Sequence, residues 1–470
     1  MKTKRLLLPL LVVLSVFTGC SDDDPNPVPA DTPITVTESE LKEAFYYTFP
    51  LMIMDATESV ETNAETFVPG IPRAPVNQFI HAVKMADASN KSVVTPNVDT
   101  YYSQLWLDMN EEPVVFEFPD VKDRFCNIQV LDAWTNTTNV ITDGGTYVFA
   151  KKGQKVSVPS GTTLVEMPTT MGWCIIRILN KGEGDYENVK KIQNAMKAYP
   201  LSAYGNAGYV APKGTYDAAK DVNPVMKCMS MSLQEYFAKA NSLMEKNSPL
   251  SFDTEIINRL KKLGVGPGLD LKQIENGAEM FDKIKASFKA DAVAIAATNK
   301  KNIGGIWSYF KEPIGDFGKA YDYRAAVALV GLGANTNEIA IYPRADYDSN
   351  KEALNGANSY TMHFSSLPPV EEGGFWSITA YGDDDYLIDN PINRYNVTDR
   401  SEYKLNADGT LDVTLSANDP QDGSYWFPTG NKGFHLFMRM YLPDLKALDS
   451  WTPPTIFLIQ THAPQEAASK

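Results

Sequence analysis

Two blocks of short β-rich segments, separated by a long stretch of helical pattern, most limit what this chain can fold into. The first block runs from about residue 97 to 180 and the second from about residue 342 onward. Short segments rich in β-branched and aromatic residues, separated by Gly- and Asp-containing turns, are typical of antiparallel sheets. We therefore predict a mixed, mainly β fold: an N-terminal antiparallel β-sandwich, a helical middle region and a C-terminal jelly-roll-like β domain.

The expected strands of the first block are 101–107, 113–118, 125–131, 146–149, 162–166 and 173–179, and those of the second are 359–364, 374–381, 410–415, 433–441 and 455–460. Apolar residues three and four positions apart predict helices over 186–199, 232–246, 253–263 and 271–299. A further helix is expected to begin after Thr37, where Glu40 completes a capping box, and to be disturbed at Pro50.

The N-terminal residues have the pattern of a bacterial lipoprotein signal. A basic start and an apolar run over 6–17 precede Cys20, which predicts removal of residues 1–19 and lipidation of Cys20. The alternative is an ordinary secretory signal with a cysteine there by chance. The acidic stretch 21–24 resembles the export signal of Bacteroidetes lipoproteins. We expect an outer-membrane lipoprotein exposed at the cell surface, with the periplasmic face as the alternative.

Composition shifts along the chain predict the remaining boundaries. Residues 20–36 are an acidic, Pro-rich linker, followed by the β-sandwich domain over 37–183, the helical region over 184–335 and the jelly-roll-like domain over 336–470. No other apolar stretch is long enough to span a bilayer, so the expected contact with the membrane is through the N-terminal lipid only.

Charge and cysteine usage exclude several function classes. The formal net charge is −15 with no basic block, which argues against nucleic-acid binding. Cys126 and Cys174 lie in apolar segments and are interpreted as core residues, with a disulfide between them as the alternative. The four histidines are far apart, and CxxC and HExxH motifs are absent, so we predict no metal site and no cofactor.

Short motifs in both halves carry a family resemblance. Asn-Val-Asp-Thr-Tyr-Tyr-Ser at 97–103, with Leu-Asp-Ala-Trp-Thr-Asn at 131–136, resembles the family known as domain of unknown function 1254. Gly-Leu-Gly-Ala-Asn at 331–335, with Asp-Asn-Pro-Ile-Asn-Arg-Tyr at 389–395, resembles domain of unknown function 1214. The resemblance implies a β-sandwich, a helical insert and a C-terminal jelly roll. It brings no activity and no catalytic residues with it.

The segment 389–395 is the first candidate site, because Pro391 restricts a loop that carries a carboxylate, amides, a guanidinium and a phenol. Asp389 and Arg394 are candidate catalytic residues, the first as a base and the second as a grip for a carboxylate or sugar. Candidate ligand-binding residues in the same loop are Asn390, Asn393 and Tyr395. The alternative is a structural loop in which these groups cap the backbone and Arg394 pairs internally.

A second polar cluster is expected at the mouth of a strand. Asp99 is the third candidate catalytic residue, and the candidate ligand-binding residues are Asn97, Tyr101, Trp106, Asp132 and Trp134. An aromatic platform beside a carboxylate is a common way to hold a sugar or an aromatic ligand. The alternative is that the aromatic side chains fill a sandwich core and the carboxylates accept hydrogen bonds from loop amides.

Three functions remain open from the sequence. The first is a surface lipoprotein that binds a small or oligomeric ligand, for instance a glycan, in a cleft between the two β domains. The second is a hydrolase or lyase that uses carboxylates at the same cleft, although there is no Gly-x-Ser-x-Gly motif. The third is a structural subunit of an outer-membrane assembly, which requires a large exposed apolar patch.

Overall fold

Strands β2 (Thr100–Asp108) and β8 (Met171–Leu179) form the centre of a five-stranded sheet with the order β1-β2-β8-β4-β5. In this computed structural model residues 32–91 and 94–461 are described, so the predicted signal and Cys20 lie outside the described residues. The other strands of this first sheet are β1 (Phe79–His81), β4 (Cys126–Asp132) and β5 (Thr137–Ile141).

A second sheet with the order β7-β6-β3-β9 packs on the first and closes a sandwich. Its strands are β3 (Val114–Phe118), β6 (Gly145–Lys151), β7 (Thr163–Met167) and β9 (Lys197–Pro200). Leu105 and Ile176 of the first sheet meet Phe116 and Phe149 of the second in the core between them. Helix α2 (Tyr186–Ala195) covers one end of this core through Val189. The sequence predicted a helix over 186–199, but the chain turns into β9 at Lys197, where it pairs with β3.

The C-terminal domain also consists of two packed sheets. One has the order β10-β11-β13-β19-β15-β16, with β12 added beside β19, and the other has the order β18-β17-β14-β20. The first of these contains β10 (Lys300–Gly304), β11 (Trp307–Phe310), β12 (Ala340–Ile341), β13 (Arg344–Ala345), β15 (Val370–Gly382), β16 (Asn396–Thr398) and β19 (Phe434–Pro443). The other contains β14 (Asn358–Phe364), β17 (Leu411–Ser416), β18 (Tyr425–Pro428) and β20 (Thr455–Thr461), and the short helix α8 (Leu445–Leu448) follows β19.

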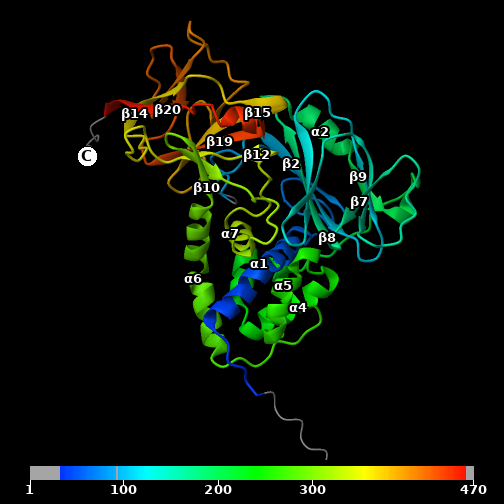
Figure 1. The fold of residues 1–470 in the computed structure, drawn as a ribbon. Coiled ribbons are helices and arrows are strands. Elements are labelled where there is room, and N and C mark those ends of the chain that lie inside the picture. Colours follow the sequence, from blue (N-terminus) through cyan, green and yellow to red (C-terminus); the bar gives the residue numbers. More distant parts are fainter. Residues whose placement is uncertain (1–31, 92–93, 462–470) are drawn as a thin grey trace, which may run out of the picture.

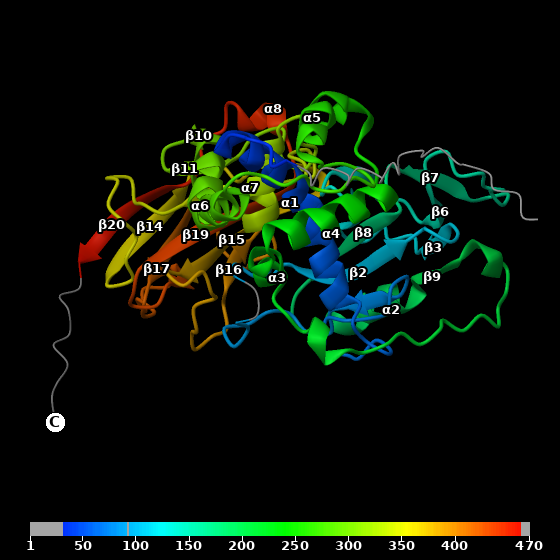
Figure 2. The ribbon, with the colours of Figure 1, turned by 90° about the horizontal axis from the view of Figure 1, so that it is seen from below.

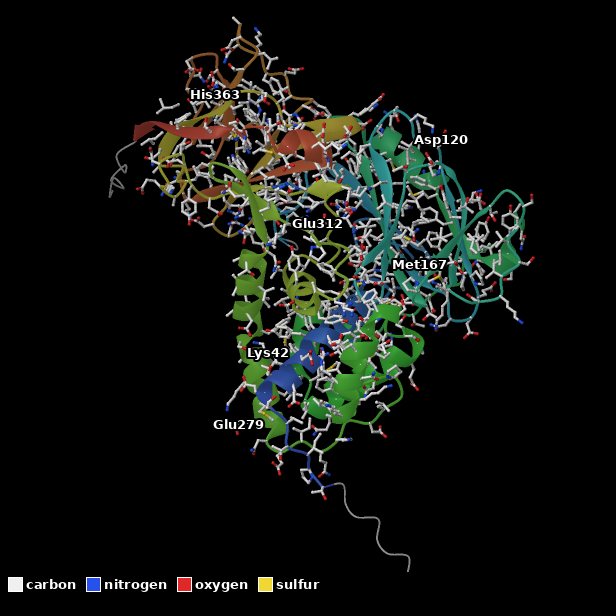
Figure 3. The ribbon with its side chains drawn as sticks, viewed as in Figure 1. Lys42, Asp120, Met167, Glu279, Glu312 and His363 are labelled. Atoms are coloured by element: carbon white, nitrogen blue, oxygen red, sulfur yellow. The ribbon has the colours of Figure 1, made fainter. Side chains whose placement is uncertain are left out.

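The helical layer lies between the two β domains and below them in the view of Figure 1. Its helices are α1 (Glu38–Glu61), α3 (Pro224–Ser230), α4 (Leu233–Lys246), α5 (Thr254–Leu260), α6 (Gly277–Thr298) and α7 (Tyr321–Val330). Figure 2 shows α1 crossing beside α3, α4, α6 and α7, and Figure 3 shows how side chains fill the layers, with Met167 in the sandwich and His363 on the C-terminal domain. The predicted fold class, mixed and mainly β with a helical middle region, is confirmed.

Helix α1 begins as the sequence predicts and ends later. Thr37 and Glu40 form the expected capping box, but the helix continues through Pro50 to Glu61. A proline inside a helix costs about 3 kcal/mol. The side chains around Pro50 are almost completely buried in the helical core, and burying each large apolar side chain contributes about 1.5–3 kcal/mol. Burial along α1 therefore outweighs the cost of Pro50.

The cysteines of the described chain are free and buried. Cys174 lies opposite Val130, whereas Cys126 lies opposite Ile178, so the two cysteines are four residues apart along β8. At about 3.3 Å per residue this separation is about 13 Å, too long for a disulfide. The interpretation as core residues is confirmed, and the alternative of a bridge is wrong.

The first sheet is buried on both faces. Side chains of one alternation, such as Leu105 and Ile176, face the sandwich core. The other alternation faces outward in cross-strand rows: Tyr102 beside Arg177 and Asn127, Gln104 beside Ile175 and Gln129, and Trp106 beside Trp173 and Leu131. The helical layer covers the tryptophan row. The middle row is covered by the segment 331–335, whose Ala334 carbonyl accepts a hydrogen bond of 2.8 Å from Gln129.

We predict that Gly333→Ala destabilises the protein more than Gly305→Ala. Both glycines have positive φ, but a Cβ on Gly333 would lie 2.9 Å from Ile175 Cδ1 and 3.2 Å from Trp173, whereas Gly305 has open space. The backbone strain alone costs about 1 kcal/mol, and the overpacking at Gly333 adds about 1–3 kcal/mol. Urea unfolding of both variants measures the difference. Equal decreases in the free energy of unfolding of the two variants would show that the segment 331–335 can move away from the sheet.

Candidate functional site

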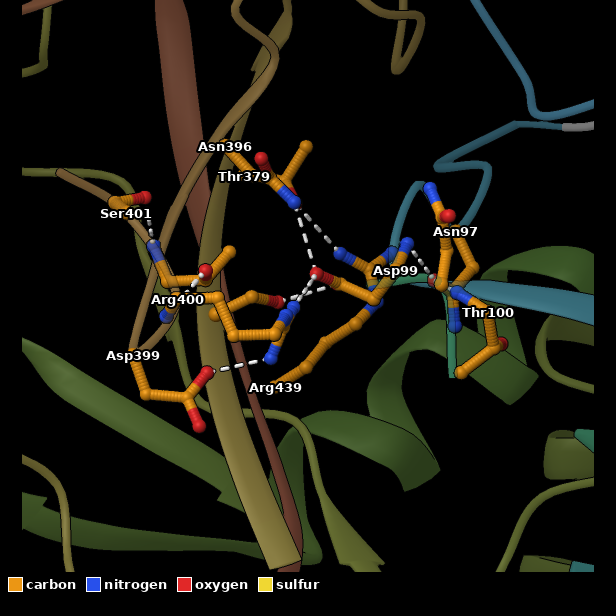
Figure 4. A network of polar contacts seen from close by, with 12 residues as sticks. Asn97, Asp99, Thr100, Thr379, Asn396, Asp399, Arg400, Ser401 and Arg439 are labelled. Atoms are coloured by element: carbon orange, nitrogen blue, oxygen red, sulfur yellow. Dashed lines mark hydrogen bonds and ion pairs between the residues drawn. The ribbon is translucent and has the colours of Figure 1, made fainter. Parts of the chain in front are cut away.

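The two β domains meet at the buried carboxylate of Asp99. This residue belongs to the N-terminal domain and lies directly before β2. Its Oδ2 accepts a hydrogen bond of 2.5 Å from Ser377 on β15, and its Oδ1 accepts one of 2.8 Å from Asn396 on β16. Arg400 forms an ion pair with the same oxygen at 3.2 Å (Figure 4). All three partners belong to the C-terminal domain, so Asp99 joins the domains.

Asn97 fixes the residues beside this carboxylate. Its Oδ1 accepts hydrogen bonds from the backbone N–H groups of Asp99 (2.6 Å) and Thr100 (3.2 Å). The amide nitrogen must therefore point the other way, where it donates to the hydroxyls of Tyr102 (3.2 Å) and Tyr441 (2.9 Å). Because Tyr441 lies on β19, Asn97 also connects the two domains.

Two buried arginines flank this junction. Arg439 on β19 donates to Thr379 (3.0 Å), to Tyr381 (2.7 Å) and to the carbonyl of Thr95 (3.0 Å). Arg177 on β8 donates to Gln129 Oε1 at 2.8 Å and to Asn335 Oδ1 at 3.3 Å. Its guanidinium carbon lies 5.4 Å from the centre of the Tyr102 ring.

Several polar atoms around Arg177 lack a partner within the described part of the chain. Thr100 Oγ1, both side-chain polar atoms of Asn127 and Arg177 Nε form no hydrogen bond there. Thr100, Asn127 and Arg177 are each at most 4 % exposed. Buried polar groups without partners are uncommon and point to places where water or a ligand completes the structure.

A cavity of about 550 Å³ lies beside this junction, and Tyr102 forms part of its wall. We call it the junction cavity. The polar residues around it are His81, Lys84, Asp87, Ser89, Asn90, Lys91, Tyr102 and Gln104, and its apolar lining includes Ile71, Ile80 and Met85. Its volume is within the usual range for small-molecule sites.

His81 in this cavity is neutral at neutral pH. Its Nδ1 lies 2.7 Å from Ser103 Oγ, and its ring stacks on Phe79. Burial lowers the pKa of His81 to about 4. Ser103 is fully buried, so this pair presents no accessible hydroxyl nucleophile to the cavity.

The segment 389–395 is held mainly within its own domain. Asn390 closes the loop by donating to the carbonyls of Ile388 and Arg394, each at 3.1 Å. Arg394 donates to the carbonyl of Trp426 and lies 4.4 Å from the centre of the Tyr425 ring. Asp389 and Asn393 are exposed. These contacts are the ones expected for a structural loop.

Tyr395 is the residue of that loop that contacts the N-terminal domain beside the junction cavity. Its hydroxyl accepts a hydrogen bond of 3.4 Å from the backbone N–H of Ala88, between the lining residues Asp87 and Ser89. The structure therefore places Asn97, Asp99 and Tyr395 at contacts between the two β domains, and none of these three residues, nor Asp389 or Arg394, is part of the cavity lining.

Trp106 lies away from Asp99, contrary to the expected cluster. It is seven residues further along the strand, which is about 23 Å. It stacks on Trp173 with ring centres 4.7 Å apart and donates to Glu61 at 2.7 Å. Tyr101 faces the sandwich core, where it packs on Tyr186. The alternation along β2 therefore separates residues that are close in sequence.

Asp132 and Trp134 also lie at the other end of the sheet. Asp132 accepts hydrogen bonds from the backbone N–H groups of Trp134 (2.8 Å) and Asn136 (2.9 Å), and burial raises its pKa to about 6. Trp134 is fully buried against Tyr47 and Arg324. Both residues thus stabilise a turn and the helical core in the way that the alternative interpretation predicted.

A larger cavity, of about 690 Å³, lies in the C-terminal domain. Its lining is mostly apolar, with Ile303, Ile306, Trp451 and Phe457, and Lys351 is its one charged lining residue. It lacks the gathering of polar and charged groups that distinguishes the junction cavity. Within residues 32–91 and 94–461, no group of three His, Cys, Asp or Glu side chains is placed to hold a metal ion.

We predict that Asp99→Asn lowers the free energy of unfolding by about 3 kcal/mol, because it leaves Arg400 without its buried partner. Asp389→Asn is the matched control: Asp389 is exposed, and its replacement should change stability by less than about 0.5 kcal/mol. Urea unfolding of the two variants checks this. Similar small changes in both would contradict the role of Asp99 as the link between the domains.

Comparisons with known proteins give a fold without an activity. The VPA0106 protein from Vibrio parahaemolyticus has a solved structure with a TM-score of 0.68 and 21% identity, covering 90% of this chain and 100% of its own. A putative uncharacterized protein from Burkholderia cenocepacia gives a TM-score of 0.42 at 14% identity, covering 89% of both chains. No curated protein matches.

Two family models match the two β-rich parts of the chain. Each carries the description of a protein of unknown function: DUF1254 matches residues 76–200 and DUF1214 matches residues 339–445. The first match contains Asn97, Asp99 and Tyr102, and the second contains Ser377, Asn396 and Arg400. The chain therefore carries the DUF1254 and DUF1214 domains together, the pair that its sequence motifs predict.

Proposed function

We propose that the protein binds a small organic ligand bearing a carboxylate, an acidic sugar for instance, in the junction cavity. One observation carries this proposal. Tyr102 forms part of the wall of a cavity of about 550 Å³, and the buried Arg177 guanidinium lies against the Tyr102 ring. Arg177 donates to the neutral oxygens of Gln129 and Asn335 and lies over the Tyr102 ring, and it forms no ion pair with a carboxylate in the described part of the chain. A buried cation without a carboxylate partner favours an anion nearby.

The charges at the rim support the same ligand class. Lys84, Lys91 and Asp87 are the charged residues of the lining, which leaves an excess of positive charge in a protein of formal net charge −15. Lysine ammonium groups attract carboxylates, and the serine and amide side chains of the lining can bind hydroxyl groups. Apolar residues such as Ile71 and Met85 suit the carbon faces of a sugar ring.

We further propose that a lipid on Cys20 anchors the protein to the outer membrane, at the cell surface. The described chain begins at the end of the helical layer that lies furthest from the β domains (Figure 1). An anchor there would hold the two β domains at a distance from the membrane. In the described part of the chain no helix has the length and apolarity to span a bilayer.

We expect Cys20→Ser to release the protein from the membrane fraction. The cysteine provides the thiol that carries the lipid, and serine cannot take its place. Fractionation of cells expressing each form, with proteinase added to intact cells, measures both anchoring and surface exposure. Cys228→Ser is the control for loss of a cysteine. Membrane retention of the Cys20→Ser variant would contradict the lipid anchor.

We expect galacturonate and glucuronate to raise the melting temperature, and galactose and glucose at the same concentrations to have less effect. A ligand at 100 times its Kd stabilises the folded protein by about 2.7 kcal/mol. Lys84→Ala should weaken uronate binding about fivefold, since an exposed ion pair contributes up to about 1 kcal/mol.

Lys122→Ala is the matched control, because Lys84 and Lys122 are similarly exposed (73% and 74%) and each pairs with one aspartate. Equal stabilisation by acids and neutral sugars, or equal effects of the two variants, would contradict the proposal.

A further inference from the structure

The hydroxyl of Tyr102 is surrounded by hydrogen-bond donors. Asn97 Nδ2 donates to it at 3.2 Å, and Asn97 cannot be turned over because its Oδ1 accepts from two backbone N–H groups. The guanidinium of Arg177, which lies over the ring, is also a donor only. Within the described part of the chain, no hydrogen bond runs from the Tyr102 hydroxyl to an acceptor. This arrangement suits an oxygen that has lost its proton.

The charges near Tyr102 favour the same state. Arg177 and Arg439 are both buried, at 4 % exposure each. Arg439 is close to Asp99 and bonded to Tyr381, but Arg177 forms no ion pair among the described residues, and phenols surround it: Tyr102, Tyr342 and Tyr441. Because an unpaired buried charge is costly, ionisation of one of these phenols would stabilise Arg177.

Tyr102 and Tyr441 differ in their pKa. Burial alone would raise the pKa of Tyr102, but the charge and hydrogen bonding of Arg177, with Asn97 and Arg439, hold it below the ordinary tyrosine value. Burial, reinforced by Tyr342 and Tyr102, raises the pKa of Tyr441 well above that value. Tyr102 is therefore the phenol beside Arg177 with the lowered pKa that also lines the junction cavity.

We propose that Tyr102 is a catalytic base and that the protein is a lyase, which eliminates the glycosidic oxygen from a uronate residue of an acidic saccharide. This inference rests on the proposed binding of a carboxylate ligand in the junction cavity. It assigns to the site a reaction in which a proton is removed from the carbon next to the carboxylate.

The elimination balances without water or a cofactor. The phenolate oxygen of Tyr102 takes the proton from the ring carbon that bears the carboxylate. The electron pair of that C–H bond forms a double bond to the next ring carbon, and the bond between this second carbon and its glycosidic oxygen breaks. The departing oxygen keeps the bonding pair and receives the proton from Tyr102. The products are an unsaturated uronate and a free hydroxyl group, and Tyr102 returns to the phenolate.

Neighbouring residues have supporting roles in this reaction. Lys84 at the rim can neutralise the substrate carboxylate, which makes the adjacent C–H bond more acidic. Arg177 acts through Tyr102 as a positioning residue. The other candidate bases are engaged: His81 is bonded to Ser103, Asp87 to Lys84, and Asp99 to Ser377, Asn396 and Arg400.

Two measurements test the assignment in the full folded chain. The first is an ultraviolet difference titration of wild type, Tyr102→Phe and Tyr147→Phe, the last on β6 in the other sheet. We expect one tyrosine to ionise below the ordinary range in wild type and in Tyr147→Phe, and not in Tyr102→Phe. Identical curves for wild type and Tyr102→Phe would overturn the inference.

The second measurement follows the absorbance of unsaturated uronate products with polygalacturonate, alginate, hyaluronan and chondroitin sulfate. We expect product from at least one polymer, a loss of rate of at least about 10²-fold in Tyr102→Phe with binding retained, and no loss in Tyr147→Phe. Binding of these polymers without any product would overturn the lyase assignment and leave the proposed binding function standing. If neither uronates nor these polymers stabilise the protein, both fail.

Discussion

The buried carboxylate of Asp99 is the interaction on which the arrangement of the two β domains depends. Removing a carboxylate from water costs several kcal/mol, and this cost is met only when the oxygens find good partners. Here Ser377, Asn396 and Arg400 provide those partners, and all three come from the C-terminal domain. The N-terminal domain cannot bury Asp99 favourably alone. The charge therefore selects one relative position of the domains.

The first sheet can hold the residues of the site in fixed positions because both of its faces are covered. Tyr101 and Tyr102 are adjacent in sequence, yet one fills the sandwich core and the other lines the cavity. Alternate residues of β2 therefore face either the apolar sandwich core or the polar outer face of the sheet. The apolar face supplies rigidity, and the polar row of Tyr102, Arg177 and Asn127 supplies charge and hydrogen bonding on a support that cannot easily move.

Much of the fold could be predicted because it depends on local signals. Alternating apolar residues located β2, β8 and β19, and the Thr37 capping box located the start of α1. The passage of α1 through Pro50 could not be predicted, since it depends on burial by helices that come much later in the chain. The conformation of 186–199 was likewise decided by pairing with β3.

The site was predictable only in part. Asn97 and Asp99 stand in a dense motif and do lie at the domain junction. Arg177 and His81 carry no local signal, because their neighbours in space are set by strand register and by the segment 331–335. Trp106 and Trp134 were expected near Asp99 because aromatic side chains suit a ligand platform. The length of β2 separates Trp106 from Asp99, and packing against α1 and α7 buries Trp134.

The two hydrogen bonds that Asn97 donates, to Tyr102 and to Tyr441, make the two β domains depend on each other. Tyr102 belongs to the DUF1254 match and Tyr441 to the DUF1214 match. The single side-chain amide of Asn97 therefore donates hydrogen bonds to a residue of each family match. The boundary drawn between two families by sequence similarity thus passes through the middle of one chemical unit. A chain carrying only one of the two domains would hold only half of that unit.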